Sequence, residues 1–121
     1  MSKKVLAVDD SKTMRDMVNF TLSGAGFEVI EAEDGVQALQ KLGNSRVDLI
    51  ITDVNMPNMD GITLIRELRA NPAHKATPIL VLTTESDGEK KNAGRSAGAT
   101  GWVVKPFDPE KLIATVAKVC P

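Results

Sequence analysis

Acidic, hydroxyl and basic side chains follow most of the apolar runs in this 121-residue chain. If these runs are parallel strands, their carboxyl ends meet at one edge of a sheet, where open parallel sheets bind their ligands. Three carboxylates, a hydroxyl and one ammonium group would then lie close together. The carboxylates are Asp9 and Asp10 after VLAV and Asp53 after DLIIT. The hydroxyl is Thr83 after PILVL, followed by Thr84 and Glu85, and the ammonium group is Lys105 after TGWVV.

This set of groups favours phosphoryl chemistry at a magnesium site. Carboxylates that lie this close raise one another's pKa unless a cation joins them. An all-oxygen site with room for water suits Mg²⁺ better than Ca²⁺ or Zn²⁺. A lysine and a hydroxyl beside it are the usual partners of phosphoryl oxygens. A carboxylate can also be the nucleophile, and Asp53 is the best candidate because it precedes the glycine-containing turn MPNMDG.

Each of these residues also has a simpler explanation. Asp9 and Asp10 could cap the following helix, and Asp53 could open a turn. Lys105 could be a solvated surface charge, and Thr83 could be an ordinary residue at a strand end. Coincidence at four strand ends of one edge is hard to sustain, so the combination favours a site.

The elements that must position these residues alternate between strands and helices. Apolar runs separated by amphipathic segments predict five strand–helix units, and hence a doubly wound α/β domain with a parallel sheet covered on both faces. Asp34 with Gln37, Ser86 with Glu89, and Asp108-Pro109 are helix-start signals. The expected strands are 5–8, 27–32, 48–52, 78–83 and 100–104. A helix is expected after each strand, with starts marked by Asp34, Ser86 and Asp108.

Composition excludes several classes of function. A net charge of −1 gives no reason to expect nucleic-acid or membrane-surface binding. The run VLAV is too short for a signal peptide or a membrane span, so we expect a cytoplasmic protein. The single cysteine, Cys120, fits a core position, and the single histidine, His74, is expected to be exposed and without a catalytic role.

At these residues the chain resembles the receiver domain of two-component response regulators. The resemblance covers essentially all 121 residues, and the stretches DDSKTMR and WVVKPF are most similar to the chemotaxis members of the family. It implies the flavodoxin-like strand order 2-1-3-4-5 and a single receiver domain, residues 1–121, without an output domain.

The resemblance also implies a role for each site residue. Asp53 would accept a phosphoryl group from the histidine of a kinase. Asp10, Asp53 and the backbone carbonyl of Asn55 would bind Mg²⁺, with Asp9 acting through water. Lys105 would pair with the phosphoryl oxygens, and Thr83 would move to donate a hydrogen bond to one of them.

Four further positions carry expectations from the family. Asn55 and Glu85 would tune the loss of the phosphoryl group. The bond between Lys105 and Pro106 would be cis. The switch aromatic of the family, usually tyrosine or phenylalanine, is here Trp102. An indole is larger than either ring, so its inward rotation would need a roomier space.

The expected partners are a chemotaxis histidine kinase and a flagellar motor switch protein, with a phosphatase as a further candidate and with the chain itself a monomer. A phosphate sink or phosphorelay carrier is the alternative within the family. A magnesium phosphatase that forms an aspartyl phosphate is a remote alternative, because the first strand lacks the DxDx[TV] pattern. A flavin-binding module is disfavoured by the acidic edge and by only 3% aromatic residues.

Overall fold

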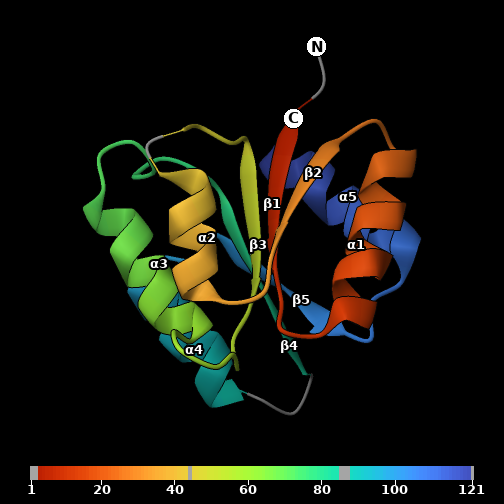
Figure 1. Ribbon diagram of the computed structural model, residues 1–121. Helices are drawn as coiled ribbons and strands as arrows, with labels where there is room; N and C mark the ends of the chain where they lie inside the picture. The colour runs from red at the N-terminus through yellow and green to blue at the C-terminus, as the bar shows by residue number, and fades with distance from the viewer. Residues whose placement is uncertain (1–2, 44, 85–87, 121) are drawn as a thin grey trace.

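A five-stranded parallel sheet organises the computed structural model, which describes residues 3–43, 45–84 and 88–120 (Figure 1). The strand order β2-β1-β3-β4-β5 confirms the predicted doubly wound topology. The strands are β1 (Lys4–Val8), β2 (Glu28–Ala32), β3 (Leu49–Asp53), β4 (Ile79–Thr84) and β5 (Gly101–Lys105). The helices are α1 (Lys12–Gly24), α2 (Gly35–Leu42), α3 (Gly61–Ala70), α4 (Gly88–Ala97) and α5 (Pro109–Val119).

Helices cover both faces of the sheet and create two apolar cores. On one face, α1 and α5 contribute Val18, Leu22, Leu112 and Val116, and the predicted core position of Cys120 is confirmed there. On the other face, α2 and α3 contribute most of the buried helix residues: Ala38, Leu42, Leu64, Ile65 and Leu68. Strand β3 is buried along its whole length, because both cores meet on it.

Local signals start the helices as the sequence predicts, with one difference. Asp34 caps α2 and Asp108 caps α5, each by accepting a hydrogen bond from a backbone N–H of the first turn. Ser11, rather than Asp9 or Asp10, caps α1. Both aspartates are therefore available for another role. The expected cap of α4 at Ser86 lies outside the described residues.

The prediction that His74 is exposed is wrong, because the residue is 1% exposed. The segment between α3 and β4 folds back on the end of α2, where the His74 Nε2 lies 2.9 Å from the Gly43 carbonyl oxygen. Arg69 fixes this segment by donating to the carbonyls of His74 and Thr77. The prediction relied on the polar sequence around His74, but contacts with the end of α2 and with Arg69 hold the residue in its buried position.

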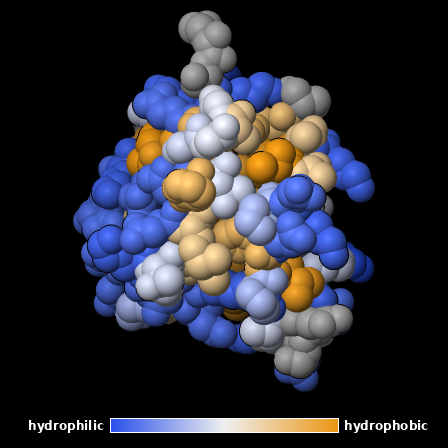
Figure 2. Space-filling model, turned by 90° about the vertical axis from the view of Figure 1, so that its right-hand side faces the viewer, coloured by the Kyte–Doolittle hydropathy of each residue, from blue (hydrophilic) through white to orange (hydrophobic). Residues whose placement is uncertain are grey.

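The face formed by α1 and α5 carries an apolar groove (Figure 2). The groove encloses about 690 Å³, and Phe20, with 84% of its surface exposed, lies beside Pro109 and Ile113. The described ends of the chain meet at the sheet edge where β1 begins, with the Lys3 Nζ 3.2 Å from the Cys120 carbonyl oxygen. No helix among the described residues is long and apolar enough to cross a membrane.

Candidate functional site

The parallel register brings the predicted site residues to one edge of the sheet. Val8 pairs with Thr52, Asp53 pairs with Leu82, and Thr84 pairs with Lys105. The residues after β1 and at the ends of β3, β4 and β5 therefore lie side by side, at the lower edge in Figure 1. This is the arrangement that the spacing of the apolar runs predicts.

Lys105 lies between two of the carboxylates. Its Nζ is 3.1 Å from the Asp53 Oδ1 and 3.3 Å from the Asp9 Oδ2. The side chains of Asp9 and Asp53 are 3% and 12% exposed, and that of Lys105 is 20% exposed. Because water is largely excluded, these ion pairs are screened less than surface pairs.

Asp9, Asp10 and Asp53 form a group that fits a metal ion. Each offers a carboxylate oxygen, and the three oxygens lie within 4.8 Å of one another. Asp9 and Asp53 are buried, whereas Asp10 is exposed and opens the site to solvent. Hard oxygen donors on one side and water on the other match the preference of Mg²⁺.

Burial and the neighbouring charges both change the pKa values of Asp9 and Lys105. Burial is the main cause that raises the pKa of Asp9, and the charge of Asp53 raises it further against the hydrogen bond from the Ser11 N–H. Burial alone would lower the pKa of Lys105, but the hydrogen bond and charge of Asp53, together with Asp9, raise it. Lys105 is therefore held as a cation, and three carboxylates exceed the charge that it can balance.

Thr83 and Asn55 line the same cavity as Asp53 and Lys105. This cavity has a volume of about 130 Å³ and is suited to a small anion rather than to an organic cofactor. Thr83 is buried at 4% exposure, and its hydroxyl lies 3.4 Å from the Thr84 carbonyl oxygen. The Asp53 Oδ1 also accepts a hydrogen bond from the Val54 N–H, which fixes the carboxylate.

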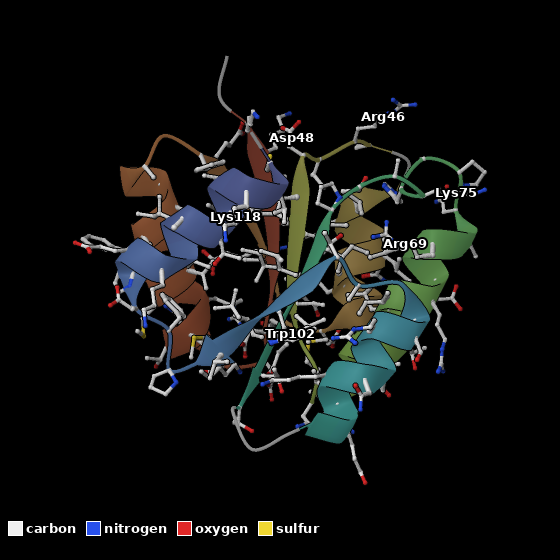
Figure 3. The ribbon with its side chains drawn as sticks, turned by 180° about the vertical axis from the view of Figure 1, so that it is seen from behind. Arg46, Asp48, Arg69, Lys75, Trp102 and Lys118 are labelled. Atoms are coloured by element: carbon white, nitrogen blue, oxygen red, sulfur yellow. The ribbon has the colours of Figure 1, made fainter. Side chains whose placement is uncertain are left out.

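Trp102 lies outside this cavity, on the face of β5 that borders α4 (Figure 3). The ring is half-buried. The Arg95 guanidinium carbon is 5.1 Å and the Lys91 Nζ 5.7 Å from its centre, so two cations of α4 contact it. Trp102 also borders a groove of about 410 Å³ with Pro106, Lys111 and Thr115.

The structure describes one of the two remaining predicted positions, Pro106, but not the other, Glu85. The peptide bond between Lys105 and Pro106 is cis. Glu85 lies outside the described residues, so its predicted role in tuning has no structural description.

The sequence analysis missed the residues that support the site. Arg15 donates to the Asp9 carbonyl oxygen at 2.6 Å and pairs with Glu31 across the gap to β2. Arg15 ends the stretch DDSKTMR, but its residue type alone does not indicate these partners, because Glu31 lies on another element. Asp34 was assigned only as a helix cap, but its second oxygen accepts a hydrogen bond from Asn58.

Comparison with known proteins identifies relatives of the same size. A family model for the response regulator receiver domain matches residues 5–117. The chain is similar to the chemotaxis protein CheY1 of Helicobacter pylori strain J99 (44% identity over 111 residues, 90% of each chain). It is also similar to the chemotaxis protein CheY of Pseudomonas aeruginosa (39% identity, 96% of this chain and 94% of the relative).

Among solved structures, the chemotaxis response regulator CheY4 of Vibrio cholerae superimposes with a TM-score of 0.93. The two sequences are 52% identical, and the match covers 98% of this chain and 99% of that structure. Topology, site geometry and sequence thus lead to one assignment. This chain belongs to the response regulator receiver domain family and is of the CheY type found in chemotaxis.

Proposed function

We propose that this chain is a phosphorylation-activated signalling switch that accepts a phosphoryl group on Asp53 from a chemotaxis histidine kinase. The observation that carries the proposal is the position of Lys105 between Asp53 and Asp9, beside a third carboxylate and a buried threonine hydroxyl. A structural ion pair alone would not need this surplus of carboxylates at an open cavity.

In the transfer step, an Asp53 carboxylate oxygen forms a bond to the phosphorus of a phosphohistidine. The P–N bond breaks, and the imidazole nitrogen keeps the electron pair. Asp9, Asp10, Asp53 and the backbone carbonyl of Asn55 would hold Mg²⁺, which supplies charge neutralisation at the phosphoryl oxygens when bound. Lys105 contributes a fixed cation to the same oxygens, so the chain itself promotes the transfer without being an enzyme for other substrates.

Phosphorylation would then bias the surface formed by α4, β5 and α5. Thr83 is one residue from the end of β4 and its hydroxyl would turn to a phosphoryl oxygen. Trp102 lies one strand away, at Val81↔Trp102 in the register, so a shift of Thr83 reaches its neighbourhood through β4. Asn55 and Glu85 would set the lifetime of the phosphoryl group.

The proposed reader of this surface is a flagellar motor switch protein in the cytoplasm. The similar chemotaxis proteins support this choice over a phosphate sink. A sink would be phosphorylated equally well, but it would not bind the motor switch protein in a phosphorylation-dependent manner.

Intact mass spectrometry tests the first step. The chain is incubated with acetyl phosphate and MgCl₂, beside an Asp53→Asn variant and a sample with EDTA. We expect a gain of one phosphoryl group only in the unmodified chain with Mg²⁺. Phosphorylation of the Asn variant to the same extent would disprove the assignment of Asp53.

A pull-down with the motor switch protein tests the second step. Binding should increase when the chain is phosphorylated and should be lost in Asp53→Asn. Equal binding with and without phosphorylation would contradict the switch, and absence of binding in both states would favour the sink.

A further inference from the structure

A hydrogen bond between Asp34 and Asn58 joins two loops at the sheet edge that carries the three aspartates Asp9, Asp10 and Asp53. One loop connects β2 to α2, and the other connects β3 to α3. The Asn58 Nδ2 donates to the Asp34 Oδ2 at 2.7 Å. The Asp34 Oδ1 accepts from the Gln37 N–H at 2.8 Å, which caps α2. One buried carboxylate thus connects the start of α2 to the loop between β3 and α3.

The backbones of the two loops also meet next to this bond. Asn58 has a φ of 67°, a left-handed conformation that no other non-glycine residue among those described adopts. The Gly35 N–H donates to the Met59 carbonyl oxygen at 3.3 Å, and a Cβ on Gly35 would lie 2.7 Å from the Met59 Cγ. The two loops are therefore in contact at Gly35 and Met59, where a larger residue than glycine would overlap the Met59 side chain.

The loop between β3 and α3 carries the backbone carbonyl of Asn55. At its start, Asp53 is fixed by the hydrogen bond from the Val54 N–H, and at its end the Gly61 N–H donates to the Val54 carbonyl oxygen at 2.8 Å. Met56 and Met59 pack against the apolar core, whereas the side chains of Asn55 and Asn58 are both exposed. The core therefore holds the two methionines of the loop, and the hydrogen bond to Asp34 ties Asn58 to the start of α2.

We propose that Asp34 and Asn58 are positioning residues whose hydrogen bond orients the Asn55 segment and thereby sets the Mg²⁺ affinity of the site. This inference rests on the proposed function, because it requires that Asp9, Asp10 and Asp53 bind Mg²⁺. Partners that orient metal ligands without touching the metal commonly change its affinity by tenfold or more.

Calorimetric titration with MgCl₂ tests the inference on two variants that retain the local backbone. Asn58→Gly removes the amide and tolerates the positive φ. Asp34→Ser keeps a capping oxygen for α2 and removes the oxygen that Asn58 contacts. We expect each variant to bind Mg²⁺ about five- to tenfold more weakly. The double variant should bind Mg²⁺ no more weakly than the single variant with the lower affinity, because both substitutions break the same hydrogen bond.

Asp60→Ser is the matched control. Asp60 caps α3 at the other end of the same loop by accepting from the Thr63 N–H at 2.8 Å, so this variant removes the same charge and keeps a cap. Its Mg²⁺ affinity should stay within about twofold of that of the unmodified chain. An equal loss in this control would overturn the inference, because loop charge would then explain the effect.

Two outcomes separate this inference from the proposed function. If the unmodified chain binds Mg²⁺ and both variants bind it equally well, the positioning role is wrong and the switch stands. If the unmodified chain neither binds Mg²⁺ nor gains a phosphoryl group from acetyl phosphate, the proposed function fails and the inference fails with it. Circular dichroism of each variant confirms that the titrated protein is folded.

Discussion

Lys105 is the residue on which the electrostatics of the site depend. Its ammonium group contacts Asp53 and Asp9, and its pKa is raised although burial works in the opposite direction. Removing one member of such a cluster leaves the remaining charges without compensation. Lys105 therefore partly offsets the repulsion between the Asp9 and Asp53 carboxylates.

Lys105→Met should lower the free energy of unfolding at pH 7 by about 2 kcal/mol in the absence of Mg²⁺, because Asp9 and Asp53 then face each other without a cation. Addition of MgCl₂ should recover part of this loss, since the metal supplies the missing positive charge. Urea unfolding followed by the fluorescence of Trp102 measures both quantities.

Lys12→Met is the control for this variant. Lys12 pairs with Asp16 at 2.9 Å, but the two side chains are 78% and 54% exposed. Such a pair contributes less than about 0.5 kcal/mol. If both methionine variants lose the same free energy of unfolding, the ion pairs of Lys105 stabilise the protein no more than an exposed surface pair.

At the scale of the elements, α4 differs from the other helices because it is held by little apolar contact. Gly94 is its only buried residue among those described, and the helix otherwise presents polar or small side chains. Elements with few buried contacts open at low free energy. This property suits a helix that borders Trp102 and belongs to the proposed output surface.

Gly94→Ala should stabilise the protein by about 0.5–1 kcal/mol, because alanine has the higher helix propensity. The added Cβ would lie 3.4 Å from the Val81 Cγ2, which is an ordinary contact. Hydrogen exchange should slow at the amides of α4 in particular. Slower exchange across the whole molecule with none specific to α4 would contradict the prediction.

Gly61→Ala is the matched substitution with the opposite sign. A Cβ on Gly61 would overlap the Asp53 carbonyl oxygen, so β3 and α3 would have to move apart. We expect a loss of about 1–3 kcal/mol, typical of overpacking. Comparison of the two variants separates helix propensity from steric fit.

The elements also show what can be predicted from sequence. Continuous apolar runs such as PILVL identify buried strands, and Asp34 and Asp108 mark helix starts, because these signals are local. His74 was predicted to be exposed, and its burial depends on Gly43, 31 positions away. The cations beside Trp102 and the bond from Asn58 to Asp34 likewise join separate elements, and no local pattern encodes them.

At the scale of the whole molecule, stability depends on pH through groups that change their pKa on folding. Hydrogen bonds from the Gln37 N–H and from Asn58 hold the pKa of Asp34 below its ordinary value of 3.8. A carboxyl with a lowered pKa stabilises the fold above its unfolded value, and this contribution is lost as the pH falls through the folded value. The affected window therefore lies below about pH 4.

Asp34→Asn should make the acid limb of the stability curve shallower below about pH 4, because the amide does not titrate. Thermal unfolding between pH 2.5 and pH 7 measures the slope for the variant and for the unmodified chain. The two curves should run parallel above about pH 5, where the Asp34 carboxyl stays ionised in both states. Identical slopes below pH 4 would show that the two hydrogen bonds do not perturb this carboxyl.

The contact between Lys3 and Cys120 places both described ends of the chain away from the site, which is useful for immobilising the protein in an assay. The described ends lie together at one edge of the sheet, and the carboxylate group lies at the opposite edge. A biosensor chip could therefore be coupled through a short tether at the edge where the ends meet, with every immobilised copy presenting its acidic cavity to the flowing sample. Two copies joined end to end by a flexible linker would likewise expose both cavities outward.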